Sequence, residues 1–211
     1  MKKIYEGIFK EGNQIFTLNL VEGIRVYNEK ILKKSGKEYR SWNPYRSKMA
    51  GAILKGAEAP IKKDSRILYL GVTNGTTASH FSDIALNGMI YGVEISFRAM
   101  KDFIKLCKKR YNLIPIIADA NKPEMYEAIV ENVDLIYQDI SQRNQVQIFL
   151  KNMEKFEPKN GIAMIKARSI DVAKKPNEVF KEVEKKIEER YKIRKAIKLS
   201  PYAKDHIAIF V

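Results

Sequence analysis

Short apolar runs separated by glycine-containing turns predict a small β-subdomain in the first part of the chain. We expect strands at 3–9 and 14–20, a third strand at 24–27 and a hairpin within 28–40, with turns at Glu11-Gly12-Asn13 and Ser35-Gly36. After Pro44, apolar residues at helical spacing predict a helix over 46–55. We therefore divide the chain into an N-terminal β-subdomain (1–41) and a main domain (42–211).

From residue 66 the pattern changes to buried-type strands that alternate with amphipathic helices. We expect strands at 66–70, 89–94, 113–117, 133–138 and 161–166, helices at 77–86, 98–110, 123–130, 144–155 and 177–190, and closing strands at 192–199 and 206–211. Such alternation indicates a parallel sheet with helices on both faces. The connection 200–205 is too short for a parallel crossover, so the closing strands must be antiparallel if they are neighbours. The predicted fold is α/β, with a mostly parallel seven-stranded sheet and an antiparallel last strand.

Glycines and acidic residues gather where the predicted strands end, which is where parallel sheets bind ligands. Gly71 and Gly75 lie in the loop after the first strand, and glycine lets a ligand approach the backbone. Glu94, Asp119 and Asp139 lie at the ends of the next three strands. Glu94 follows Gly75 at about the spacing of a ribose-binding acid, and a solvated glutamate is the alternative. Three acids suit a cation with hydroxyls better than phosphates, and dinucleotide and P-loop motifs are absent, so we expect S-adenosyl-L-methionine.

The net charge of +14 narrows the range of partners. Residues 1–60 and 151–211 carry +6 and +7, whereas residues 61–150 carry +1. Basic ends favour a polyanion such as RNA, and adaptation to a hot environment is a second cause of abundant charge. The single cysteine, Cys107, excludes a disulfide framework and a cysteine-based zinc site and favours a reducing, cytoplasmic compartment. We expect no metal site and, because no apolar run approaches roughly 18 residues, no membrane partner.

Four polar residues are predicted near the edge of the sheet where a substrate would approach. They are Lys48 on the entry helix, Asp139 and Lys166 at strand ends, and His206 at the start of the last strand. Taken singly, Lys166 could be a rim lysine and His206 a hydrogen-bonded rim histidine. Lys48 taken alone carries no signal.

Seven stretches of the main domain form an ordered series of motifs: WNPYRSKMAGAILKG (42–56), LYLGVTNGTTASHFSDI (68–84), YGVEIS (91–96), ADANKP (118–123), VDLIYQDISQRNQ (133–145), IKARSIDV (165–172) and KDH (204–206). Together they resemble the fibrillarin family of RNA 2′-O-ribose methyltransferases in its compact archaeal form. The resemblance implies a Rossmann-like class I methyltransferase and supports Lys48, Asp139, Lys166 and His206 as catalytic residues. With the first-loop glycine, the expected cofactor-binding residues are Gly71, Thr76, Thr77, Glu94, Ile95, Asp119, Ala120, Asp139, Ile140, Ser141 and Gln142. Asn74, Phe97 and Gln138 depart from the usual family residues and leave the candidate catalytic groups in place.

The reaction that the resemblance implies is methyl transfer to a ribose 2′-hydroxyl, which needs alignment and a proton acceptor. We expect Lys166 to be that acceptor, held by Asp139, while Lys48 and His206 orient the hydroxyl and a neighbouring phosphate. A free lysine is mostly protonated near neutrality, so a charged Lys166 that stabilises developing oxyanion charge is the alternative.

The resemblance also implies partners. It implies methylation of pre-rRNA and tRNA at sites chosen by a box C/D guide RNA, in a ribonucleoprotein with a Nop-domain scaffold and a kink-turn-binding ribosomal-type protein. Two other functions stay open: a non-catalytic RNA-binding subunit, and a methyltransferase for a small molecule or a protein. The Asp139/Lys166 pair argues against the first, and the charge of +14 argues against the second.

Overall fold

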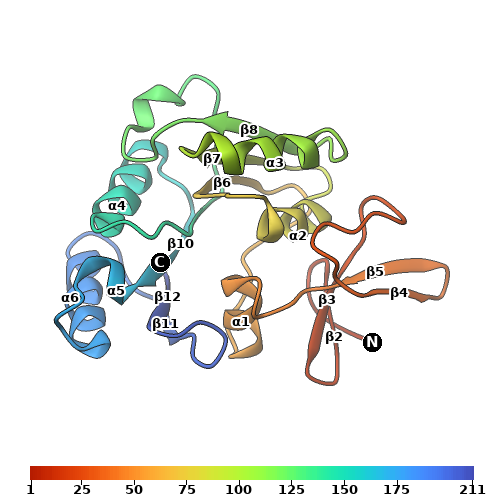
Figure 1. Ribbon diagram of the computed structural model, residues 1–211, viewed down its shortest axis with the longest axis horizontal. Helices are drawn as coiled ribbons and strands as arrows, with labels where there is room; N and C mark the ends of the chain where they lie inside the picture. The colour runs from red at the N-terminus through yellow and green to blue at the C-terminus, as the bar shows by residue number, and fades with distance from the viewer.

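The N-terminal part of the chain forms a five-stranded antiparallel sheet. The computed structural model describes residues 1–211, and this sheet lies to the right in Figure 1. Its strands, in the spatial order β1-β2-β3-β5-β4, are β1 (Lys2–Tyr5), β2 (Ile8–Glu11), β3 (Gln14–Leu18), β4 (Ile31–Lys34) and β5 (Lys37–Ser41). The predicted hairpin within 28–40 is therefore present as β4 and β5.

Two predictions for this sheet are wrong. The single strand expected at 3–9 is two strands, because Gly7 turns the chain with a φ of +66° close against Ile84. The strand expected at 24–27 is a loop. The backbone amides of Val26 and Tyr27 donate to the carboxylate of Glu29 instead of to a neighbouring strand.

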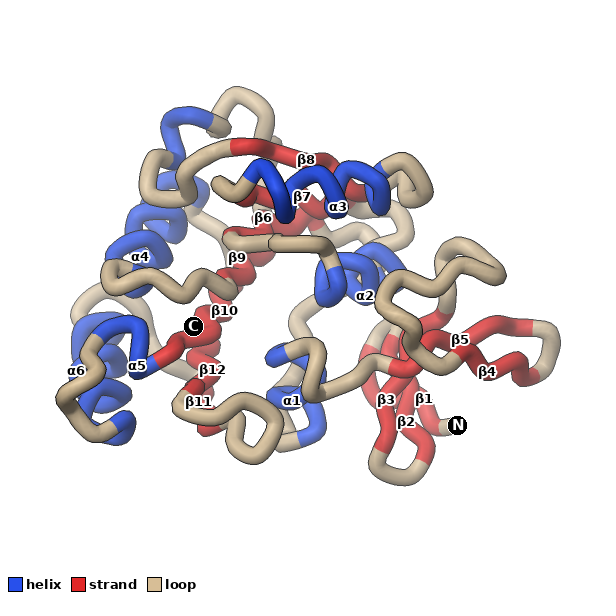
Figure 2. The backbone as a smooth tube through the Cα atoms, viewed as in Figure 1, coloured by secondary structure: helices blue, strands red, loops and turns tan.

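The main sheet has seven strands in the order β11-β12-β10-β9-β6-β7-β8. Figure 2 shows them as one row, from β8 at the top to β11 at the bottom. They are β6 (Arg66–Leu70), β7 (Met89–Glu94), β8 (Leu113–Ile117), β9 (Leu135–Gln138), β10 (Asn160–Lys166), β11 (Lys195–Lys198) and β12 (His206–Phe210). Only β12 runs against the others, between β10 and β11. The predicted fold class is confirmed, including the antiparallel last strand and the small N-terminal sheet.

Helices cover both faces of this sheet (Figure 1). One face is covered by α1 (Lys48–Leu54), α2 (Thr76–Ile84) and α3 (Phe97–Cys107), and the other by α4 (Gln145–Phe156) and α6 (Pro176–Glu188). Strand residues alternate between the two cores: Ile67 and Tyr69 belong to the first, Leu68 and Leu70 to the second. None of the helices combines the length and apolar character that crossing a membrane requires.

Two helix predictions are also corrected. The helix expected at 123–130 is only a 3₁₀ turn, η1 (Pro123–Met125). Tyr126 ends that turn, is fully buried, and donates its hydroxyl to Asn152 on α4, so a tertiary contact replaces a continued helix. A short helix, α5 (Ala167–Ile170), follows β10 where the sequence pattern predicts none.

A buried ionic cluster attaches the N-terminal sheet to α2. Asp83 on α2 accepts from Arg40 of β5 at 2.7 Å and from Arg110 at 2.7 Å, and Arg40 also pairs with Glu29 at 2.6 Å. The four side chains are completely shielded from solvent. Thr17 of β3 donates to the same Asp83 carboxylate. Because the sheet also shares a core with α1 and α2, the division into domains 1–41 and 42–211 stays a prediction.

We expect Asp83→Ala to destabilise the protein by about 3–5 kcal/mol, because two buried guanidinium groups lose their shared counter-charge. Urea unfolding measures this loss. The matched control is Asp102→Ala, since Asp102 also pairs with a cation, Lys105, but lies exposed; its urea midpoint should stay at the wild-type value. Equal stability of Asp83→Ala and Asp102→Ala would contradict a stabilising role of the buried ionic cluster.

Candidate active site

The loop after β6 is shaped by glycines that no other residue could replace without displacement. Gly71 has a φ of +80°, and a Cβ there would lie 2.6 Å from the carbonyl oxygen of Asp139. Gly75 has a φ of +84°, and a Cβ there would lie 2.6 Å from the ring of Phe103. The loop therefore passes close to the end of β9 and starts α2 at Thr76.

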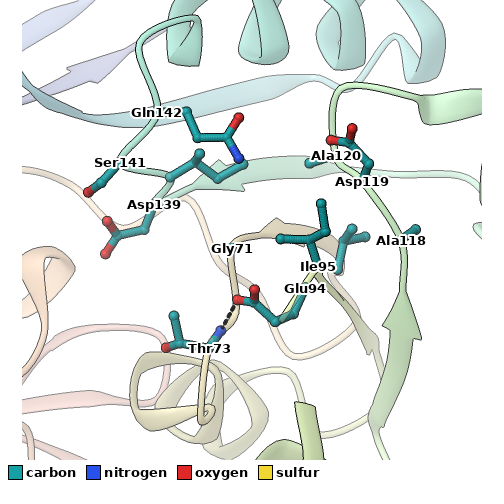
Figure 3. Close-up of a pocket in the computed structure, with 12 residues that line it drawn as sticks. Gly71, Thr73, Glu94, Ile95, Ala118, Asp119, Ala120, Asp139, Ser141 and Gln142 are labelled. Atoms are coloured by element: carbon teal, nitrogen blue, oxygen red, sulfur yellow. Dashed lines mark hydrogen bonds between the residues drawn. The ribbon is translucent and has the colours of Figure 1, made fainter. Parts of the chain in front are cut away.

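Glu94, the last residue of β7, holds this loop in place. One carboxylate oxygen accepts from the backbone amide of Thr73 at 3.0 Å (Figure 3), and the other accepts from the amide of Ser96 at 2.9 Å. The side chain is buried, so the alternative of a solvated glutamate is wrong. Each oxygen keeps a free lone pair that can accept from a ligand hydroxyl.

A hollow of about 240 Å³ lies over the ends of β6, β7, β8 and β9. It brings together nine predicted cofactor residues: Gly71, Glu94, Ile95, Asp119, Ala120, Asp139, Ile140, Ser141 and Gln142. Figure 3 shows its acidic side chains at the ends of neighbouring strands, with the Asp139 carboxylate on the side away from Asp119. Sequence reasoning missed Thr73, Val93 and Ala118, which also line it. All three lie within three residues of a predicted strand end, and that position is the signal that could have found them.

The other two predicted cofactor residues, Thr76 and Thr77, line a second hollow beside the first. This hollow measures about 390 Å³, and Tyr45, Arg46, Lys48 and Tyr69 also line it. The two hollows share Gly71, Thr73, Asp139 and Ser141. The Thr77 hydroxyl donates to Ser47 Oγ at 2.9 Å, which ties α2 to the start of α1.

Asp139 stands at the junction of the two hollows and is paired with Lys48. Lys48 Nζ lies 2.6 Å from Asp139 Oδ1, and both side chains are only partly exposed. The expectation that Asp139 holds Lys166 is wrong, because α1 brings Lys48 to this carboxylate. Lys166 Nζ makes no hydrogen bond or ion pair with the protein, whereas the Gln145 amide fixes the Lys166 backbone at both N–H and carbonyl.

Lys166 and His206 face each other across the β10–β12 ladder, at the edge of the sheet that carries the hollows. His206 Nδ1 donates to the Lys204 carbonyl at 2.6 Å, which leaves Nε2 as the acceptor of a neutral ring. Burial lowers the pKa of His206, and the charges of Lys48 and Lys166 lower it further against the opposing effect of Asp139 and the Lys204 carbonyl. The charges of Lys48, Asp139 and Lys166 thus all act on the pKa of His206, although Lys166 and His206 do not line either hollow. The protein has no cluster of His, Cys, Asp and Glu placed to hold a metal ion.

A sheet with one reversed strand, a glycine loop after its first strand and acids at the following strand ends defines an S-adenosylmethionine-dependent methyltransferase of the Rossmann-like class. A methyltransferase of this class from Aquifex aeolicus shares the fold at 14% identity, with a TM-score of 0.55 over 75% of this chain and 86% of that one. The model of the family described as Fibrillarin matches residues 1–211. The chain therefore belongs to the fibrillarin family.

Relatives and solved structures agree with this assignment over nearly the whole chain. A fibrillarin-like rRNA/tRNA 2′-O-methyltransferase of Methanosarcina acetivorans is 48% identical, over 99% of this chain and 96% of that protein. The crystal structure of Aeropyrum pernix fibrillarin with natively bound S-adenosyl-L-methionine is 45% identical, with a TM-score of 0.86 over 93% and 88% of the two chains. A fibrillarin solved in complex with Nop5p is 42% identical, with a TM-score of 0.92 over 99% and 98%.

These comparisons confirm the predicted family, the enzyme class and the cofactor. The protein is an S-adenosylmethionine-dependent 2′-O-methyltransferase rather than a non-catalytic subunit. The assignment of individual residues to catalysis and to cofactor binding stays a prediction.

We expect the two histidines to titrate differently in a heteronuclear NMR experiment. His206 should titrate below 6.5, and Lys48→Ala should raise its pKa, because a neighbouring positive charge is removed and Asp139 loses its partner. His80 should stay neutral over the pH range in which His206 titrates, since complete burial and two arginines hold the pKa of His80 well below the usual value. A His206 pKa above 6.5, or one that falls in Lys48→Ala, would contradict this electrostatic arrangement.

Proposed function

We propose that this protein methylates ribose 2′-hydroxyls of rRNA and tRNA at sites selected by a guide RNA paired to the target. The observation that carries the proposal is that Asp139 separates two adjoining hollows, one suited to the cofactor and one open to a substrate. The second hollow holds the cations Arg46 and Lys48, which suit the phosphates that flank a ribose. A small-molecule or protein substrate would leave the basic ends of the chain without a role.

The lining of the first hollow fits S-adenosyl-L-methionine. Glu94 and Asp119 offer acceptors for ribose hydroxyls and amino groups, and no lysine or arginine lines the hollow to oppose a cation. Ile95 and Ile140 offer apolar surface for a flat ring, while Gly71, Ala118 and Ala120 leave room for it. When bound, this cofactor supplies an electrophilic methyl group on a sulfonium.

In this proposal the chain mainly aligns the 2′-hydroxyl and moves its proton. The Lys48–Asp139 pair orients the hydroxyl at the junction of the hollows. His206 lies opposite Lys166 on the neighbouring strand, and its neutral ring adds no positive charge that would oppose proton transfer to the lysine. Lys166, whose amine is not tied to another side chain, takes the hydroxyl proton in its neutral form as the oxygen attacks, and becomes the ammonium. Because Asp139 is occupied by Lys48, it does not lock Lys166 in an ion pair.

The proposed partners follow from the family and from charge. A fibrillarin has been solved in complex with Nop5p, and we extend to this chain a Nop-domain scaffold, a box C/D guide RNA and a kink-turn-binding ribosomal-type protein. The excess positive charge at both ends of the chain supports the RNA part of this assembly. A cytoplasmic location belongs to the same proposal, supported by the single cysteine.

The test of the function is transfer of a labelled methyl group to a guide-paired target RNA in the assembled particle. We expect one methyl group per target, none on a target whose selected nucleotide is 2′-deoxy, and a loss of at least about 100-fold in Asp139→Ala. Full activity on the 2′-deoxy target would refute 2′-O-methylation. Full activity in Asp139→Ala would refute the role of the junction.

The role of Lys166 is tested by Lys166→Arg, which keeps the positive charge but cannot release a proton at accessible pH. If Lys166 accepts the proton, the variant should lose about 100-fold or more in kcat, and the rise of the wild-type rate with pH should disappear. Retained kcat would instead assign Lys166 to stabilising the charge of the oxyanion. Unchanged affinity for S-adenosyl-L-methionine is the control for an intact fold.

A further inference from the structure

Tyr45 is a large aromatic side chain that stays exposed beside the proposed reaction centre. It is 67% exposed, and it lines the same hollow as Lys48 and Asp139. The Tyr45 hydroxyl makes no hydrogen bond with the protein, so hydrogen bonding of this side chain does not account for an aromatic ring at this exposed position. Exposed aromatic rings beside a basic substrate hollow are suited to contact nucleic acid.

The position of this ring is fixed by its neighbours. The Tyr45 backbone amide donates to Asn43 Oδ1 at 2.8 Å, which sets the turn before α1. The Tyr45 and Tyr202 rings meet in an edge-to-face arrangement, with centroids 5.3 Å apart and planes at 73°. An edge-to-face contact of this kind is favourable and leaves area on the Tyr45 ring uncovered.

Tyr202 connects two segments that carry candidate catalytic residues. It lies in the loop between β11 and β12, four residues before His206. Its side chain lies directly over Gly51 of α1, where an added Cβ would be 3.1 Å from Tyr202 Cβ. The backbone of this loop is held by a bond from Tyr202 N–H to the Leu199 carbonyl at 2.9 Å. The Tyr45–Tyr202 pair is therefore a supported platform that joins the Lys48 helix to the His206 loop.

We propose that the ring of Tyr45 packs against the sugar of a target-strand nucleotide next to the methylated one, and that Tyr202 is a positioning residue that holds the ring. The inference rests on the proposed function. In a guide-paired target the bases are stacked and paired, whereas the riboses and their 2′-hydroxyls lie in a wide, shallow minor groove. A ring at the edge of the reaction centre therefore contacts the riboses in that minor groove. Such a contact reads no sequence, which suits an enzyme whose sites are chosen by a guide.

The experiment compares kcat and KM for a guide-paired target RNA in the assembled particle. We expect Tyr45→Ala to lower kcat/KM about fivefold, a scale taken from the lower end of the range for a base stacked on an aromatic ring, because a sugar covers less of the ring than a base does. Affinity for S-adenosyl-L-methionine and the thermal midpoint should stay at wild-type values. Tyr45→Phe should retain at least half of kcat/KM, because the ring and not the hydroxyl makes the contact.

Tyr111→Ala is the matched control. The exposed fraction of Tyr111, 70%, is close to the 67% of Tyr45. Tyr111 precedes β8, however, and so lies at the opposite edge of the sheet. Its removal should leave kcat/KM unchanged. Tyr202→Ala should lower kcat/KM less than Tyr45→Ala, and the double variant should match Tyr45→Ala alone if Tyr202 acts only through the ring.

A second substrate separates the sugar from the base. In a target that is abasic at the methylated nucleotide and at both of its neighbours, the fold-loss caused by Tyr45→Ala should persist. Loss of that difference would assign the ring to a base and overturn the sugar contact. If the wild type is active and Tyr45→Ala has the same kcat/KM, the inference about Tyr45 is overturned and the proposed function stands. A wild type that transfers nothing to any RNA would overturn the proposed function instead.

Discussion

The structure depends on one buried carboxylate, that of Asp83. Arg40 reaches it from the N-terminal sheet and Arg110 from the segment after α3. A buried charge is tolerable only when its partners are in place, so these three elements must assemble together. The same helix, α2, begins with Thr76 and Thr77 in the second hollow, which Arg46 and Lys48 also line. The N-terminal sheet, which carries no candidate catalytic residue, thereby fixes the orientation of a helix that shapes the site.

The site itself separates charges over a short distance. The first hollow has acidic residues and no basic ones, while Arg46 and Lys48 line the second. Asp139 belongs to both, and its pairing with Lys48 places the boundary between a region suited to a cation and a region suited to an anion. The molecule can thus be strongly basic as a whole without repelling a sulfonium cofactor.

Sequence reasoning succeeds here where burial alone decides the structure. The bounds of β6 and β7 match the predictions because their apolar runs are buried on both faces. The bounds of β8, an edge strand, also match although Ile117 is exposed. The strand-end acids follow from the order of these strands. Sequence reasoning fails where a particular side-chain contact decides. The loop 24–27 is held by the Glu29 carboxylate, two or three residues along the chain, and Lys48 reaches Asp139 across 91 positions of sequence. No local pattern encodes that placement of α1, and for this reason the prediction that Asp139 pairs with Lys166 is wrong.

The reversed direction of β12 has a practical consequence. This strand begins at His206, at the edge of the sheet that carries the two hollows, and runs away from that edge, so that Val211 bonds to Gly161 at the amino-terminal edge of the sheet. A fluorophore, biotin or affinity handle attached at the Val211 end of β12 would therefore lie on the side opposite the two hollows. Tethering the protein to a surface at this end of β12 would keep both hollows facing solution.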